Sequence, residues 1–288
     1  MRNFKSTSRK FALLAIGAIV LTACGESRSS NSAAGDSAST TTEVVRTKNK
    51  MVSTDQCTEI FIAELEAQGM GDACSVGSVG AGGGIIFFVN LKNFTSKGSA
   101  CGSSCRYLEV APKGWIVANN VLGLPNQSNC EIAGTSTRDP QCAWSESRTS
   151  WANTTTDSRI GTGFTNTSTI INQFGNSGGA ATVARTYRGG SKTDWFLPSA
   201  DELIQLCRYA WGLSFDAGSR SCLRTQKSTR VSGFEDFYVS STQYEDPIQN
   251  QVSIQDDRSK YFLLNVLGGK FGWGKKSFDT FVRPVRAF

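Results

Sequence analysis

The positions of nine cysteines constrain the fold of this 288-residue chain more than any other feature. One of them, Cys24, follows an apolar N-terminal run. The other eight form an even set, which in an exported protein is typical of a disulfide framework. Eight cysteines allow about 105 pairings, and pairing of sequence neighbours is the simplest because it closes only short loops. We therefore expect the disulfides Cys57–Cys74, Cys101–Cys105, Cys130–Cys142 and Cys207–Cys222.

Two other uses of these cysteines stay open. A zinc site needs clustered thiolate or imidazole ligands, whereas the only closely spaced pair is Cys101 and Cys105 and the sequence contains no histidine. A copper site or a redox-active thiol pair would need an exposed, reactive cysteine, which a sequence does not reveal. The lack of histidine also excludes Ser-His-Asp and Cys-His catalysis and imidazole metal ligands.

The N-terminus has the pattern of a bacterial lipoprotein signal. Four cations precede an apolar run, 11–21, that is too short to cross a membrane comfortably. The run ends in Leu21-Thr22-Ala23-Cys24, which resembles a lipobox. We therefore expect residues 1–23 to be cleaved as a signal peptide and Cys24 to carry several acyl chains, which anchor a protein without spanning the bilayer. A plain secretory signal is the alternative.

Composition divides the mature chain into three parts. Residues 24–50 are rich in Ser, Thr, Ala and Gly and are expected to form a flexible tether. Residues 51–79 hold one short helix, about 54–68, and the start of a glycine-rich hinge at 77–84. A phosphate-binding loop is disfavoured there because no Gly-Lys-Ser/Thr follows the glycines. Residues 80–288 are expected to form the main domain.

The main domain combines short strands with helices. Its clearest element is a helix that starts after Ser199 and runs to about Tyr209, because Ser199 and Glu202 form a capping box and the apolar side of the helix must lie on a core. Two further helices are expected around 167–174 and 179–187. Runs of β-branched and aromatic residues predict strands at 85–89, 107–111, 237–241, 251–254, 261–266 and 281–285.

The charge pattern bears on possible partners. The formal charge of +6 is concentrated at the N-terminus, where residues 1–23 contain four cations and no acid. Nucleic-acid binding is therefore not implied for the exported part. In the last third, acids dominate residues 231–257 and cations dominate residues 258–288. Such a switch is typical of a solvated face with internal ion pairs.

Six separated motifs occur in one order along residues 80–288. They are Gly83–Phe88, Tyr107–Pro112, Ile160–Gly163 with Asn166-Thr167, Asp194–Ser199 with Asp201–Leu203, Tyr238–Thr242 and Val282–Phe288. This set resembles the domain family typified by the C-terminal domain of the Legionella collagen-like adhesin Lcl. Members of that family are typically exported or surface-anchored. Some bind sulfated glycans, and others are variable ligand-binding proteins of diversity-generating retroelements.

The resemblance implies an α+β fold of the C-type-lectin kind, in the variant related to formylglycine-generating enzymes. Such a fold has a small twisted antiparallel sheet, two or three helices and long loops, here stapled by disulfides. Two features depart from the family. Val239 stands where the family usually has Trp, and the Cys130–Cys142 insertion lengthens a loop region. Details of a ligand therefore cannot be transferred from the family to this chain.

The sequence offers one candidate ligand-binding surface. Between residues 270 and 276, lysines and aromatic residues alternate with glycines, which predicts an exposed loop that binds an anionic glycan by charge and ring stacking. With two upstream residues, the candidates are Tyr244, Lys260, Lys270, Phe271, Trp273, Lys275 and Lys276. Arg283 and Arg286 alternate with valines on a terminal strand, and we expect them to pair with acids at the edge of the core instead.

Acidic pairs offer two weaker alternatives. Asp256 and Asp257 are candidate calcium ligands, as in many lectins, although the spaced oxygen ligands of an EF-type loop are missing. Asp194 and Glu202 would suit glycosidase chemistry, but Glu202 is better explained as a helix cap. We therefore expect no catalytic residue and no resident cofactor.

These features together predict a non-catalytic lipoprotein, exported and lipid-anchored to the cell envelope at the outer membrane or the cell surface. Its lectin-like domain is expected to bind an extracellular glycan or protein. The alternatives are an enzyme of the formylglycine-generating or glycan-modifying kind and a structural envelope protein. No nucleic-acid partner is expected, and the oligomeric state stays open.

Overall fold

The computed structural model describes residues 57, 74–115, 130–131, 138–144, 156–174, 179–213, 222, 231–244, 260–266 and 268–288. These residues form an α+β domain with three α-helices and two β-sheets, which confirms the predicted α+β class. Several predictions lie outside the described residues: the signal peptide and tether, Cys24, the helix 54–68, the strand 251–254, and Asp256 and Asp257.

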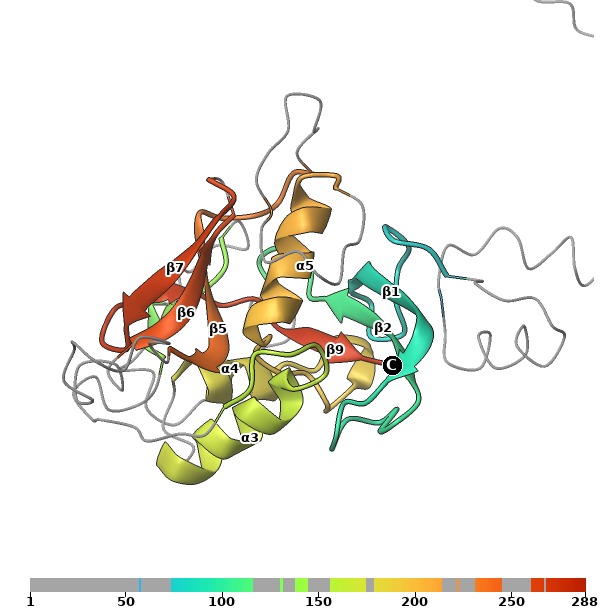
Figure 1. The fold of residues 1–288 in the computed structure, drawn as a ribbon, viewed down its shortest axis with the longest axis horizontal. Coiled ribbons are helices and arrows are strands. Elements are labelled where there is room, and N and C mark those ends of the chain that lie inside the picture. Colours follow the sequence, from blue (N-terminus) through green and yellow to red (C-terminus); the bar gives the residue numbers. More distant parts are fainter. Residues whose placement is uncertain are drawn as a thin grey trace, which may run out of the picture. The chain divides into compact units, whose positions relative to one another are not determined.

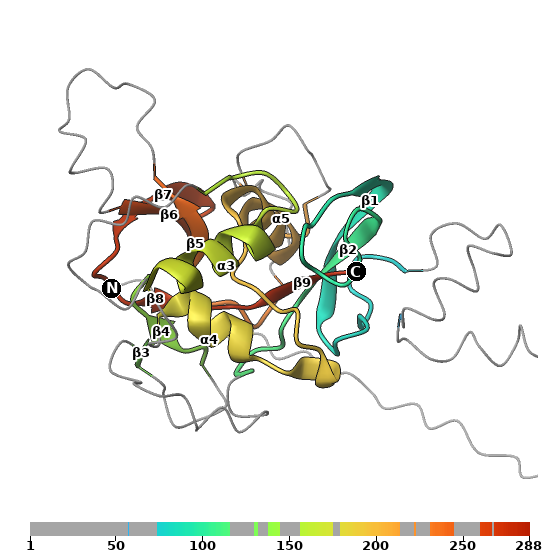
Figure 2. The same cartoon turned by 90° about the horizontal axis from the view of Figure 1, so that it is seen from below.

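The smaller sheet joins the two ends of the described domain. Its strands are antiparallel, in the order β1 (Ile85–Phe94), β2 (Cys105–Val110) and β9 (Val285–Ala287). The chain ends one residue beyond β9, where the carbonyl of Phe288 accepts hydrogen bonds of 2.9 Å from the N–H groups of Arg106 and Tyr107. Figure 2 shows β9 beside β2, with the C-terminus at the edge of this sheet.

The larger sheet has six strands and is mostly antiparallel. Its order is β3 (Cys130–Glu131), β4 (Gln141–Cys142), β8 (Thr280–Phe281), β5 (Phe237–Gln243), β6 (Lys260–Asn265) and β7 (Lys270–Lys275). Only the pairing of β5 with β8 is parallel. β7 therefore forms one edge of this sheet in the described part of the chain.

The prediction of an exposed loop at residues 270–276 is wrong. Residues Lys270 to Lys275 form strand β7, and each of them pairs with a residue of β6, from Lys260↔Lys275 to Asn265↔Lys270. Glycines weaken the sequence signal for a strand, which is why the segment resembles a loop. The packing explains one of them, because a Cβ atom on Gly274 would lie 2.5 Å from Cδ2 of Leu263.

Three helices accompany the sheets: α3 (Gly163–Phe174), α4 (Ala180–Thr186) and α5 (Ala200–Ala210). The capping box of α5 is confirmed, since the Ser199 hydroxyl accepts the N–H of Glu202 while the Glu202 carboxylate accepts the N–H of Ser199. Helix α5 contacts β1, β5 and β6. Figure 1 shows it standing between the two sheets, so its apolar side contributes to the core of both.

Three tryptophans fill the core, and each has a hydrogen-bond partner for its indole N–H. Trp115, Trp144 and Trp195 have no exposed surface. Their Nε1 atoms donate to the backbone carbonyls of Val282, Ser240 and Gly189, at 3.0, 2.9 and 3.2 Å. Burying a large ring without leaving its N–H unpaired is the favourable arrangement for tryptophan. Trp144 thereby ties a loop to β5, and Trp115 ties another to the segment just after β8.

The structure places all four predicted cysteine pairs at disulfide-bonding distance. Their Cα atoms are 5.8, 5.0, 4.0 and 5.8 Å apart for Cys57–Cys74, Cys101–Cys105, Cys130–Cys142 and Cys207–Cys222. The first pair packs against the smaller sheet, together with Ile86, Tyr107 and Phe288. The N–H of Cys57 also donates to the carbonyl of Val79 at 2.7 Å. This pair therefore belongs to the core of the domain.

The expected glycine-rich hinge is instead a tight loop that encloses a buried carboxylate. Glu109, on β2, has no exposed surface. It accepts the N–H of Gly82 at 2.8 Å and the N–H of Gly84 at 3.0 Å. A Cβ atom on Gly82 would lie 2.7 Å from Oε1 of Glu109 and 2.5 Å from the ring of Trp195. The glycines therefore permit close packing here.

Candidate functional site

The predicted ligand-binding residues lie on and beside the edge hairpin formed by β6 and β7. Residues directly opposite each other on paired strands share one face of a sheet. Phe262 faces Trp273 in this register, and Lys260 faces Lys275. Tyr244 follows directly after β5, and its ring contacts the same hairpin. The structure therefore brings several of the candidates together from three segments of the chain.

Four aromatic rings form the surface that we call the aromatic face: Tyr244, Phe262, Phe271 and Trp273. The ring of Tyr244 lies 5.2 Å from that of Phe262 and 6.3 Å from that of Trp273, while Phe262 stacks on Phe271 at 5.1 Å. Trp273 is 50% exposed although it is a large apolar residue. Such a ring, held by its neighbours and open to solvent, is able to stack on a flat ligand.

The lysines differ in how they relate to this face. The ammonium of Lys260 lies 4.4 Å from the ring centre of Trp273 and is largely buried. Lys270 and Lys275, at the two ends of β7, are exposed. Cations within about 6 Å of an indole ring are attracted to it. Lys260 therefore orients the Trp273 ring, while the two exposed lysines add positive charge along the edge strand.

Lys276 does not lie on an exposed loop, contrary to the expectation from the sequence. Only 2% of its surface is exposed. Its ammonium lies 4.1 Å from the ring centre of Trp144 and donates to Oε1 of Gln243 at 2.7 Å. Burial lowers the pKa of the Lys276 amine to about 7, because an apolar environment disfavours the charged form. The Lys276 side chain therefore connects the buried ring of Trp144 to Gln243, the last residue of β5.

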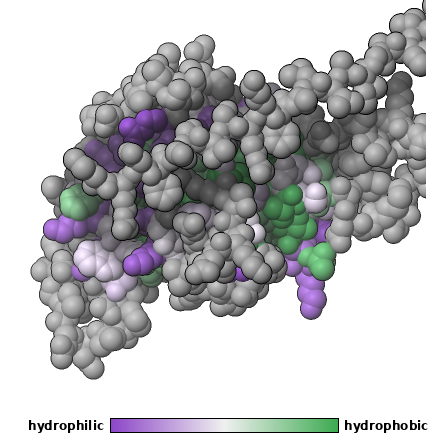
Figure 3. All heavy atoms as spheres, turned by 90° about the horizontal axis from the view of Figure 1, so that it is seen from above, coloured by the Kyte–Doolittle hydropathy of each residue, from purple (hydrophilic) through white to green (hydrophobic). Residues whose placement is uncertain are grey.

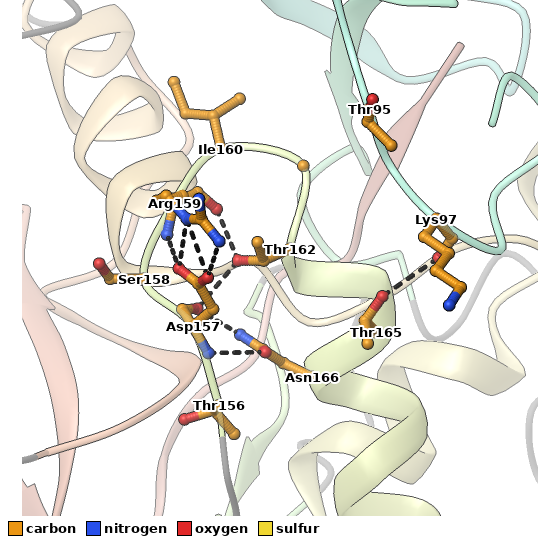
Figure 4. A pocket seen from close by; sticks show the side chains of 11 residues that line it. Thr95, Lys97, Thr156, Asp157, Ser158, Arg159, Ile160, Thr162, Thr165 and Asn166 are labelled. Carbon is orange, nitrogen blue, oxygen red and sulfur yellow. Dashed lines mark hydrogen bonds and ion pairs between the residues drawn. The ribbon is translucent and has the colours of Figure 1, made fainter. Parts of the chain in front are cut away.

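A second concavity, which the sequence did not predict, lies where α3 begins. It has a volume of about 720 Å³. We call it the polar cavity. One wall is formed by Thr95 and Lys97, just after β1, and the other by residues 156–162 with Thr165 and Asn166 of α3. Figure 4 shows these two segments on opposite sides of the cavity. The only sequence signal here was the motif Ile160–Gly163 with Asn166-Thr167, which carried no assigned role.

The loop 156–162 is fixed mainly through Asp157. The backbone carbonyl of Asp157 accepts three side-chain hydrogen bonds, from Thr162 at 2.9 Å, Asn166 at 2.6 Å and Thr242 at 3.2 Å. Its N–H donates to Oδ1 of Asn166 at 3.0 Å. The loop has no regular secondary structure, so these bonds replace the backbone pairing of a strand or helix.

Glu202 ties this loop to the start of α5. Its carboxylate accepts the N–H of Gly161 at 2.8 Å, in addition to the N–H of Ser199 in the capping box. A Cβ atom on Gly163 would lie 2.3 Å from this carboxylate. Burial raises the pKa of Glu202 to about 7, although the N–H donors lower it. The residue interpreted as a helix cap thus also positions a wall of the polar cavity.

An apolar groove of about 360 Å³ lies between β1 and the C-terminal end of α5. Phe87, Phe88 and Val89 line one side, and Tyr209 and Leu213 line the other. In the space-filling view from above, hydrophobic side chains reach the surface at more than one place, and the largest group of them lies toward the right (Figure 3). The apolar lining suits contact with other apolar groups rather than chemistry.

The other predicted charged residues are engaged in structural pairs. Arg286 pairs with Glu109 at 3.1 Å and with Asp194 at 2.5 Å. Arg283 pairs with the buried carboxylate of Asp139 at 2.6 Å. The expected pairing of both arginines with acids is therefore confirmed. Asp194 and Glu202, the candidate acidic pair, are held by Arg286 and by backbone N–H groups, respectively.

The described residues offer no ready metal centre and no membrane-spanning helix. Within them, no group of three or more Cys, Asp or Glu side chains is placed to hold a metal ion. None of the helices in this part of the chain has the length and apolarity needed to cross a bilayer. No protein-family model matches the chain, and no curated protein is significantly similar to it.

Proposed function

We propose that this chain is a lipid-anchored protein of the cell envelope whose C-terminal domain binds an acidic glycan through the aromatic face. The N-terminal signal with its lipobox supports export and lipidation of Cys24. The motif order supports a C-type-lectin-like fold of the variant related to formylglycine-generating enzymes. The four cysteine pairs at bonding distance are consistent with an oxidising compartment.

One observation carries the proposal: the half-exposed ring of Trp273 on an edge strand, packed against Tyr244, with Lys275 on the same face and the ammonium of Lys260 over the ring. Flat apolar faces of sugar rings stack on aromatic side chains, and sulfate or carboxylate groups are attracted by lysine ammonium groups. The exposed Lys275 lies two residues from Trp273 and therefore on the same face of β7, whereas the exposed Lys270 lies at the other end of the strand on the opposite face. This combination suits an acidic polysaccharide better than a neutral one.

An enzymatic role is the alternative. A thiol-dependent enzyme of the formylglycine-generating kind needs a free reactive cysteine, which the four paired positions disfavour. The acidic pair considered for glycosidase chemistry is occupied by structural contacts. These observations favour binding without catalysis.

Binding of the full-length protein, purified in detergent, to an array of sulfated, carboxylated and neutral glycans tests the proposal. The array is probed at low and high salt, with and without calcium. We expect binding to acidic glycans that weakens as salt rises, because the lysines are solvent-exposed and their charge is screened. Binding that is equally strong for neutral glycans, or no binding to any glycan, would contradict the proposal.

Matched variants locate the binding surface. Trp273→Ala and Lys275→Glu are each expected to weaken binding by about tenfold or more, the loss typical of a central contact residue. Phe237→Ala removes an aromatic side chain of similar exposure (44%) that is not part of the aromatic face. Lys92→Glu reverses an exposed charge on β1, in the other sheet. Both controls should leave binding unchanged, and an equal loss in them would place the ligand elsewhere.

A further inference from the structure

We infer that the polar cavity at the start of α3 is a second binding site, which takes a single carboxylated sugar unit. The cavity is separate in sequence from the aromatic face, since it is built from residues 95–97 and 156–166. Its volume of about 720 Å³ is within the range of about 300–1,000 Å³ that is usual for small-molecule sites. The inference does not depend on the proposed function.

The two walls of the cavity are linked to each other at two points. Gly161 has a φ of +90°, and a Cβ atom there would lie 2.0 Å from the backbone carbonyl oxygen of Thr95, so only glycine lets the walls approach this closely. The hydroxyl of Thr165 donates to the carbonyl of Lys97 at 3.2 Å and links the walls a second time. A site that is already formed loses less conformational entropy when a ligand binds.

The Arg159 side chain is oriented although it is exposed. Its side chain is 78% exposed, yet Nε donates to Oδ1 and Oδ2 of Asp157 at 3.1 and 2.9 Å, and Nη2 donates to Oδ2. Nη1 makes no hydrogen bond to any described residue. Exposed ion pairs contribute little to stability. This pair holds the guanidinium over the Asp157 carboxylate, at the wall of the cavity that both residues line (Figure 4).

The charges of the cavity favour a monoanion. Lys97 lies on the wall opposite Arg159 (Figure 4), and no acid among the described residues pairs with its ammonium. Asp157 is neutralised by Arg159, so the lining carries one positive charge in excess. Guanidinium and ammonium groups together bind a carboxylate well. A net charge of one balances a carboxylate monoanion and leaves a phosphate dianion half compensated.

The rest of the lining suits sugar hydroxyl groups. Thr95, Ser158, Thr162 and Thr165 present hydroxyl oxygens, and the Asp157 carboxylate offers acceptor oxygens at 37% side-chain exposure. Only Ile160 adds a sizeable apolar side chain to the lining. A hexuronate or a nonulosonate, which combines one carboxylate with several hydroxyls, therefore matches the cavity more closely than an aromatic or aliphatic acid does.

Calorimetric titration of the full-length protein in detergent tests this site. The probes are glucuronate, galacturonate and N-acetylneuraminate, with glucose and galactose as neutral controls. We expect saturable binding of at least one carboxylated sugar and about tenfold weaker binding of the neutral sugars, the factor that corresponds to one charge-assisted hydrogen bond. Absence of saturable binding by all three acids would overturn the inference, as would equal binding of a neutral sugar.

Variants separate this site from the aromatic face. Arg159→Gln and Lys97→Gln should each weaken binding by about tenfold, and Arg159→Lys should restore only part of the affinity because it keeps the charge but not the planar fork. Trp273→Ala should leave the binding of the sugar acid unchanged. Thermal unfolding of each variant checks that it is folded. Loss of binding in Trp273→Ala with retention in Arg159→Gln would assign the sugar acid to the aromatic face instead.

Discussion

Replacing Asp139 with alanine is expected to destabilise the domain strongly, because it leaves a buried arginine without its counter-charge. Asp139 is 2% exposed. Its Oδ2 accepts hydrogen bonds from Nε of Arg283 at 2.6 Å and from the hydroxyl of Tyr238 at 2.7 Å. Its Oδ1 accepts the N–H of Gly114 at 3.1 Å. Three groups from separate segments therefore lose their acceptor in one substitution.

The size of the effect follows from the burial of the pair. The side chain of Arg283 is 3% exposed, and without Asp139 it retains only neutral hydrogen-bond partners, the carbonyls of Ala111 and Gly233 and the hydroxyl of Tyr238. Removing one partner of a buried ion pair costs about 3–5 kcal/mol. The free energy of unfolding of a domain is about 5–15 kcal/mol in total. For a domain of this size, the loss lowers the melting temperature by about 6–20 °C.

Urea unfolding of the full-length protein, under oxidising conditions and at neutral pH, measures this cost. Lys113→Met is the control, because it breaks an exposed pair with Glu235 in which the lysine is 42% exposed, and such pairs contribute less than about 1 kcal/mol. The double variant Asp139→Ala/Arg283→Met should be more stable than the sum of the single losses predicts. A cost for Asp139→Ala as small as that of the control, or strict additivity in the double variant, would refute the reasoning.

Two further predictions concern buried groups. The pKa of Glu202 is raised from 4.5 to about 7 in the folded protein, so the folded state binds more protons between these values and its stability falls as the pH rises. The free energy of unfolding relative to Glu202→Gln should therefore decrease by about 3 kcal/mol from pH 4.5 to pH 7, and a pH-independent difference in urea unfolding would contradict this. Gly82→Ala should cost about 1–3 kcal/mol by overpacking against Trp195. Gly272→Ala, where nothing lies within 4 Å of the added Cβ, should stay within about 0.5 kcal/mol.

Local signals in the sequence predicted the parts of the fold that depend on neighbours in the chain. The capping box at Ser199 and Glu202 involves residues three positions apart, and the two hydrogen bonds are present as expected. The four cysteine pairs are also sequence neighbours, with separations of 4 to 17 residues. In both cases the information needed to predict the contact lies within a short stretch of chain.

Features set by distant contacts were missed. β7 was interpreted as a loop because of its glycines, whereas the close packing of Gly274 on Leu263 is visible only once β6 and β7 are paired. Lys276 was expected at the surface, but Trp144, far away in the sequence, covers its ammonium. Hydrophobic patterning does not report such a contact, because a lysine is normally found at the surface.

The polar cavity could not be predicted for the same reason. Its walls come from residues 95–97 and 156–166, and nothing in either segment alone indicates the other. They meet because Gly161 allows the backbone to approach Thr95, and because Thr165 bonds to the carbonyl of Lys97. The motif that contains Gly161 was visible in the sequence, but the role of its glycine depends on a contact partner about 65 positions away.

One principle connects these missed features. The domain contains long segments without regular secondary structure, whose backbone N–H groups still need acceptors when buried. Three buried carboxylates provide them: Glu109 for Gly82 and Gly84, Asp139 for Gly114, and Glu202 for Gly161. Acidic residues are normally expected at the surface, whereas these three side chains are buried. Because a carboxylate binds two or more N–H donors at once, one substitution at such a position should loosen a whole loop.

That arrangement explains how a domain with so much loop presents defined surfaces. The carboxylate of Glu202 holds one wall of the polar cavity to the start of α5, and the hydroxyl of Thr242 holds the same wall to β5. β5 ends at Gln243, whose N–H donates to the hydroxyl of Thr156 in the cavity wall. The next residue, Tyr244, belongs to the aromatic face. Both candidate binding surfaces therefore depend on the end of β5, so a substitution that displaces it should alter the two together, whereas Trp273→Ala and Arg159→Gln should each alter only one.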